Sequence, residues 1–179
     1  MSTTHADAVE FWRDAGPGRW FKKDDGFDAE LRARFEAAHF AAARRELDGW
    51  AETAEGALAL LILLDQVPRN IFRGTAHQFA TDPLALAMAE AALAAGHDRA
   101  VEQGLRVFFV LPLEHAEDLA LQERAVALLA DEAEDIARFA RVHRDIIARF
   151  GRFPHRNPAL GRETTPEEAA FLAEGGFGG

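Results

Sequence analysis

The sequence predicts an all-α protein, and three observations support this class. Apolar residues recur at spacings of three and four through most of the chain, as in Phe27, Leu31 and Phe35. Capping residues precede several of these segments, and glycine or proline follows them. The one run with strand character, residues 107–111, has no second strand with which it could pair. We expect seven or eight helices, packed as helical hairpins in a bundle or short superhelix.

The first half of the chain carries the clearest helix signals. A segment from about Asp25 to Leu47 has apolar side chains at helical spacing: Phe27, Leu31, Phe35, Ala38 and Ala42. Thr53 is placed to cap a second helix, whose run 57–64 is apolar on all sides, as in a central buried helix. Pro68 lacks an N–H and is expected to bend or end that helix, and Gly74 suits the position just past its end.

In the second half, caps and breakers mark further helices. Thr81 and Pro83 open a helix that is expected to stop at Gly96. Three more helices are expected over residues 98–111, 113–130 and 131–150. A capping box, from Thr165 to Glu168, begins a last short helix.

Length and composition indicate one globular domain. The chain has 179 residues, of which 49% are apolar, and no glycine- or serine-rich linker divides it. We therefore expect a single domain over residues 1–179, with about the first seven and last six residues flexible. The start of the sequence has neither the basic nor the apolar region of a secretion signal, so the expected location is the cytoplasm.

Several classes of function are disfavoured by the residues present. A net charge of −10 argues against nucleic acid as a partner, and no apolar run is long enough to span a membrane. Cysteine is absent, which excludes disulfides and thiolate chemistry. The chain has no P-loop, dinucleotide fingerprint or G-x-S-x-G motif, and we expect no cofactor. The oligomeric state is left open.

Polar groups on apolar helix faces mark three candidate sites. The first is Asp65, Arg69 and Asn70, where helical spacing allows an ion pair between Asp65 and Arg69. This pair could clamp the helix end near Pro68, or its guanidinium could face a ligand anion. The second is Glu114, His115 and Asp118, expected on one helix, where they could hold a divalent metal ion or serve as general acid and base. The alternative for this second group is a solvated acidic helix face with one hydrogen-bonded histidine.

The third candidate site follows a helix with one apolar stripe: Ile136, Phe139, His143, Ile146 and Phe150. His143 lies in the middle of this stripe, where it is either a core histidine or a site residue. Further polar candidates come after it: Arg152, His155, Arg156 and Asn157. Residues 141–162 hold six Arg against one acid, whereas residues 114–135 hold eight acids against one Arg. The two segments could pair with each other, or the basic one could frame an anion site.

Four of these stretches together resemble a known family. They are residues 19–22, 64–70, 111–118 and 150–157, which occur in this order in the uncharacterised bacterial family called domain of unknown function 924. The resemblance extends from about Ala8 to Ala173, with Val67 where Phe is expected and Ala116 where Ser is expected. It implies a tetratricopeptide-like (TPR-like) helical fold and adds no activity.

Two functions are consistent with these residues. The first is a binding module, in which the polar candidates line a cleft for a small anionic ligand or a protein segment. The alternative is a metal-assisted hydrolase, with Glu114, His115 and Asp118 holding the ion. In it His143 or His155 acts as the base, and the arginines hold an anionic substrate. No metal ligand set is complete in the sequence alone, and whether the protein is an enzyme is left open.

Overall fold

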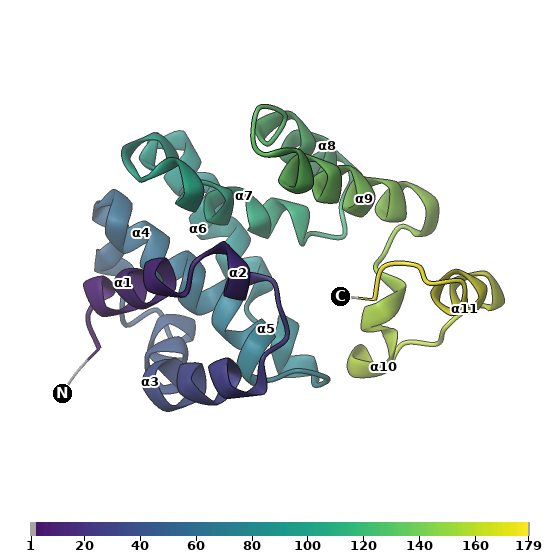
Figure 1. Ribbon diagram of the computed structural model, residues 1–179, viewed down its shortest axis with the longest axis horizontal. Helices are drawn as coiled ribbons and strands as arrows, with labels where there is room; N and C mark the ends of the chain where they lie inside the picture. The colour runs from purple at the N-terminus through teal and green to yellow at the C-terminus, as the bar shows by residue number, and fades with distance from the viewer. Residues whose placement is uncertain (1–2, 179) are drawn as a thin grey trace. The chain divides into compact units, whose positions relative to one another are not determined.

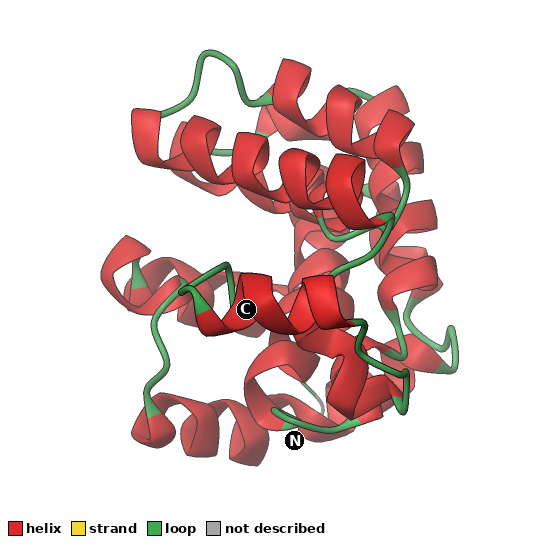
Figure 2. Cartoon of the chain, turned by 90° about the vertical axis from the view of Figure 1, so that its right-hand side faces the viewer, coloured by secondary structure: helices red, strands yellow, loops and turns green. Residues whose placement is uncertain are grey.

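The computed structural model describes residues 3–178, and over this range it consists of helices and connecting loops without a strand (Figure 2). The all-α class is therefore confirmed. Contacts group the chain into two compact units, Met1–Arg73 with His77–Pro112 (unit 1) and Gly74–Ala76 with Leu113–Gly179 (unit 2). None of the described helices has both the length and the apolar character needed to cross a membrane.

The helical segments outnumber the seven or eight expected, because proline, glycine and capping residues divide the longer ones. Those of unit 1 are α1 (His5–Ala15), α2 (Pro17–Trp20), α3 (Asp25–Ala43), α4 (Ala54–Leu61), α5 (Val67–Ile71) and α6 (Asp82–Ala94), labelled in Figure 1. Helix α7 (Val107–Glu114) crosses the boundary between the units, and α8 (Leu119–Leu128), α9 (Glu134–Phe150), α10 (Asn157–Leu160) and α11 (Pro166–Ala173) belong to unit 2. Short 3₁₀ turns lie at Asp48–Glu52, Ala76–Phe79, His97–Ala100, Gln103–Leu105 and Pro154–Arg156.

The expected flexible ends fall partly on residues 1–2 and 179, which lie outside the described residues. Among the described ones, Thr4 caps α1 through a capping box with Asp7, so helical structure begins within the first seven residues. Residues 107–111, which have strand character in sequence, are helical as predicted. The expected helix start at residue 98 is wrong, because two short 3₁₀ turns precede α7, which begins at Val107.

The core of unit 1 is built on α4 and the residues that follow it. Leu58 to Leu64 are each at most 2% exposed, as their unbroken apolar run predicts. Thr53 caps this helix by accepting a hydrogen bond from the Gly56 N–H at 3.1 Å. A Cβ atom on Gly56 would overlap the carbonyl oxygen of Trp50, so only glycine fits here. Thus the start of the buried helix is specified by a cap and a close backbone approach.

Pro68 changes the hydrogen bonding of the buried helix rather than ending it. Residues Ile62–Gln66 form a π-helix, in which the Val67 N–H bonds the carbonyl of Ile62, five residues back. Pro68 has no N–H to offer to the carbonyls of Leu63 and Leu64. His39 Nδ1 lies 2.8 Å from the oxygen of Leu63 and Thr81 Oγ1 lies 2.5 Å from that of Leu64. Side chains from α3 and from the residue before α6 therefore satisfy the carbonyls that Pro68 leaves open.

Unit 2 corrects two expectations about its helices. The helix expected over 113–130 is divided, because the Asp118 carboxylate caps α8 by accepting from the Leu121 N–H at 3.1 Å. The buried face of α9, which packs on α8, is also rotated from the predicted stripe, since Phe139 is 42% exposed whereas Ala140 and Ile147 are buried. The capping box at Thr165 and Glu168 is confirmed at the start of α11.

Candidate functional site

The first predicted site lies in unit 1, where Arg69 joins two carboxylates. Its guanidinium donates to both carboxylate oxygens of Asp82, at 2.8 and 3.0 Å, and pairs with Asp65 Oδ1 at 3.0 Å. Burial tends to lower the pKa of Arg69, but the charges of Asp65 and Asp82 outweigh it and raise that pKa. The predicted pair of Asp65 and Arg69 is confirmed. Asp82 was missed, and its place beside a helix start gave no sign of this contact.

Asn70 extends the same arrangement within unit 1. Its Nδ2 donates to the carbonyl of Gln66 at 3.0 Å, while its Oδ1 accepts from Arg73 at 2.6 Å. Arg73 in turn pairs with Asp28 of α3 at 2.7 Å. These bonds tie α5 to α3 and to the π-helix, so the polar residues of the motif from residue 65 to residue 70 all have partners within unit 1. A role of Asp65, Arg69 and Asn70 in ligand binding stays a prediction.

In unit 2, a buried carboxylate orients His143. Nδ1 of His143 lies 2.8 Å from Glu114 Oε1 and 2.9 Å from the carbonyl oxygen of Phe139. Because both neighbours are acceptors, Nδ1 must carry the proton, and in the neutral ring Nε2 is then the acceptor. The side chains of His143 and Glu114 are only 9% and 4% exposed. Glu114, the last residue of α7, therefore sets both the tautomer and the direction of the imidazole on α9.

Two further histidines lie close to His143. The rings of His115 and His143 have centroids 6.3 Å apart, in an edge-on arrangement. Burial lowers the pKa of His155 to about 3, with further lowering from the charges of Arg156, His143 and His115. Nδ1 of His155 is buried and has no hydrogen-bond partner among the described residues. We call Glu114, His115, His143, His155 and Arg156 the histidine cluster.

An aromatic ring lies beneath the cluster. The guanidinium carbon of Arg156 is 4.4 Å from the ring centroid of Phe153, and Arg156 is only 6% exposed. The same ring lies 5.5 Å from His143 and 5.7 Å from His155. Phe153 itself is completely buried. It therefore supports three members of the histidine cluster from one side.

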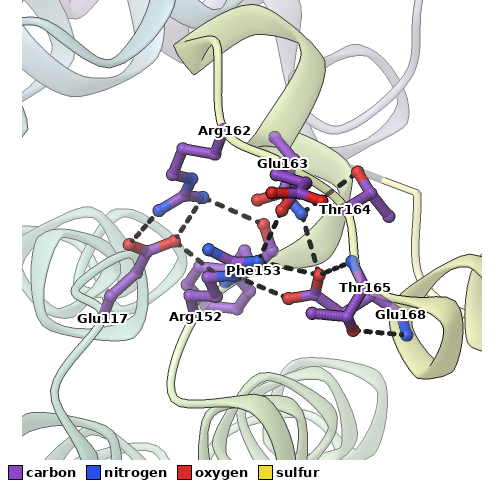
Figure 3. Close-up of polar contacts among 9 residues, drawn as sticks. Glu117, Arg152, Phe153, Arg162, Glu163, Thr164, Thr165 and Glu168 are labelled. Carbon is purple, nitrogen blue, oxygen red and sulfur yellow. Dashed lines mark hydrogen bonds and ion pairs between the residues drawn. The ribbon is translucent and has the colours of Figure 1, made fainter.

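A network of ion pairs holds the backbone of Phe153 in place (Figure 3). Glu117 accepts from the Phe153 N–H at 2.8 Å and from both terminal nitrogens of Arg162, at 2.7 and 3.0 Å. Arg162 also donates to the carbonyl of Phe153 at 3.2 Å. Burial tends to raise the pKa of Glu117, but these hydrogen bonds outweigh it and lower that pKa. Glu117 and Arg162 were not predicted as site residues, and their role is to fix the support beneath the cluster.

Two of the predicted candidates belong to a second network, also drawn in Figure 3. Arg152 donates to both carboxylate oxygens of Glu168, at 2.6 and 2.9 Å, and to the carbonyl of Glu163 at 2.8 Å. Asn157 Nδ2 donates to the same carboxylate at 3.2 Å. The hydrogen bonds from Arg152 lower the pKa of Glu168 to about 2. Arg152 and Asn157 are thus bonded to α11 rather than gathered in the histidine cluster.

The geometry gives no support to the metal-ion alternative. Among the described residues, no group of three or more Asp, Glu or His side chains is placed to hold a metal ion. Glu114 is bonded to His143, and Asp118 is the cap of α8 rather than a neighbour of Glu114 on one helix. Opposite charges of the acidic and basic segments do pair within unit 2, as one reading predicted: Arg162 with Glu117 and Arg141 with Glu134.

Comparisons with known proteins agree with the resemblance carried by the four motifs. The profile of the family described as "Bacterial protein of unknown function (DUF924)" matches residues 8–176. The chain belongs to this family. The structure of a protein of unknown function, ATU0120 from Agrobacterium tumefaciens, is similar with a TM-score of 0.93 and 59% sequence identity, over 95% of this chain and 97% of that one. A search of curated proteins found no match. None of these comparisons assigns an activity.

Proposed function

We propose that this member of the DUF924 family is a binding module whose histidine cluster takes a small anion. The observation that carries the proposal is the gathering of Arg156, His143 and His155 around the ring of Phe153, at 4.4, 5.5 and 5.7 Å from its centroid. A guanidinium beside imidazole rings is suited to binding a negatively charged group. The cleft predicted around these residues, the TPR-like packing and the cytoplasmic location stay part of this proposal.

Two carboxylates lie near the cluster. Glu114 is hydrogen-bonded to His143, and Glu117 is bonded to two nitrogens of Arg162 and to a backbone N–H. The charge of Glu117 also acts on Arg156 and His155. Because His143 and Arg156 are only 7% and 6% exposed, the arrangement suits a small anionic group better than a broad protein surface.

Titration with inorganic phosphate at two pH values tests the proposal. Because a guanidinium keeps its charge at both pH values, phosphate should bind at about pH 6 and at about pH 8, and should bind more weakly with added salt. A metal ion should instead bind more weakly as the pH falls, because protonated histidine cannot be a ligand. Isothermal titration calorimetry with phosphate, citrate, Zn²⁺ and Mn²⁺ distinguishes the two kinds of site.

Two arginine variants provide a matched comparison. Arg156→Gln should weaken phosphate binding about tenfold or more, because it removes a charged hydrogen-bond donor. Arg144→Gln removes the same charge from the surface of α9, where Arg144 pairs with its neighbour Asp145, and should change the affinity by less than about twofold. Equal affinities in both variants, or no heat from any anion with the wild-type protein, would refute anion binding at the cluster.

A further inference from the structure

A fourth ring, Phe177, lies against the histidine cluster. Its centroid is 4.5 Å from that of His143 and 5.3 Å from that of His155, and both contacts are edge-on. Phe177 also packs on the buried group formed by Ile146, Ile147 and Phe153. The place beside the two imidazoles is therefore suited to an aromatic ring.

Glycines after α11 direct this ring to its place. Gly175 has a φ of +85°, which other residues rarely adopt, and Gly176 donates to the carbonyl of Phe171 at 2.9 Å. A Cβ atom on Gly176 would overlap both the backbone and the ring of Phe171. The turn that returns the chain toward His143 thus depends on two glycines. Because they directly precede Phe177, the sequence determines the course of the chain up to this residue.

The contacts of Phe177 are of a kind that a ligand can replace. Within the described residues they are contacts of its ring, whereas the backbone bonds of this segment are made earlier, by Gly175 and Gly176. Moving the ring away costs apolar and edge-on contacts that another aromatic ring would restore. It leaves the hydrogen bond between Glu114 and His143 intact, since these residues lie on α7 and α9.

Building on the proposed anion site, we propose that the ligand is an aromatic anion, whose ring displaces Phe177 from His143 and His155. Its charged group then lies at Arg156, which shares the Phe153 ring with both imidazoles. The chemical class is a planar ring joined to a carboxylate by a short linker. In the free protein Phe177 occupies the ring position, so it competes with such a ligand.

Matched probes separate the contribution of the ring to the binding affinity from that of the charge. Calorimetry with 3-phenylpropionate, propionate and the neutral 3-phenylpropionamide is carried out on the wild-type protein and on Phe177→Ala. In the wild type, 3-phenylpropionate should bind about three- to tenfold more tightly than propionate, and the amide more weakly than either acid. In Phe177→Ala the affinity for 3-phenylpropionate should rise further, while that for propionate stays within about twofold.

Nuclear magnetic resonance then follows Phe177 directly. Nuclear Overhauser contacts between its ring and the His143 ring should disappear on adding 3-phenylpropionate and persist with propionate. Equal affinity for the two acids, or contacts that persist in the 3-phenylpropionate complex, would overturn the aromatic class and leave the anion site standing. If neither these acids nor phosphate binds, the proposed function itself fails.

Discussion

Replacing Thr81 with valine tests how unit 1 accommodates Pro68. Thr81 is 7% exposed, and its hydroxyl donates to the Leu64 carbonyl at 2.5 Å. Valine keeps the shape of the side chain and removes the donor, so a buried carbonyl loses its bond. We expect Thr81→Val to lower the free energy of unfolding by about 1–3 kcal/mol. Thr3, whose hydroxyl makes an exposed contact of 3.5 Å, supplies the control, since Thr3→Val should cost less than about 0.5 kcal/mol.

A second substitution tests whether the Leu64 carbonyl needs the hydrogen bond from Thr81 because Pro68 lacks an N–H. Pro68→Ala restores an N–H four residues after Leu64, at the position where an α-helix bonds that carbonyl. In this background the cost of Thr81→Val should shrink by about 1 kcal/mol or more, because the carbonyl has a second donor. Urea denaturation of the four proteins, followed by tryptophan fluorescence, gives the coupling energy. Additive effects, within about 0.5 kcal/mol, would show that Thr81 does not compensate for Pro68.

Two further predictions concern the hydrophobic core and the loss of stability at low pH. Leu61→Ala should cost about 2–5 kcal/mol, because Leu61 is 1% exposed and its loss leaves a cavity; an unchanged urea midpoint would place the helix at the surface. The pKa of Glu168 is about 2, below its ordinary value of 4.5. The ionised Glu168 therefore stabilises the fold fully above about pH 4.5, and this stabilisation is lost as the pH falls toward 2. Glu168→Gln should therefore flatten the fall in melting temperature between these pH values, whereas Glu174→Gln, on an exposed residue, should leave it unchanged.

Much of the fold could be predicted because its signals are local. The caps at Thr53 and Thr165 act within three residues, and the apolar run through Leu64 identifies a buried helix without knowledge of its neighbours. The family could also be identified, since its four motifs are short and lie in a set order. The division at Asp118 was missed although its signal is local too, an aspartate directly before a helix.

The sequence by itself therefore determined the all-α class, the caps at Thr53 and Thr165, and the family of this protein. Only the tertiary structure decided which polar groups meet. Arg69 pairs with Asp82, thirteen residues away, and Glu117 pairs with Arg162, forty-five residues away. Phe177 contacts His143 because the chain turns after α11. Helical periodicity shows which face of a helix is buried, but it does not identify the residues that pack against that face. For that reason the motifs do not show their partners in sequence. In the structure, residues 64–70 bond within unit 1, whereas residues 111–118 and 150–157 supply members of the histidine cluster of unit 2.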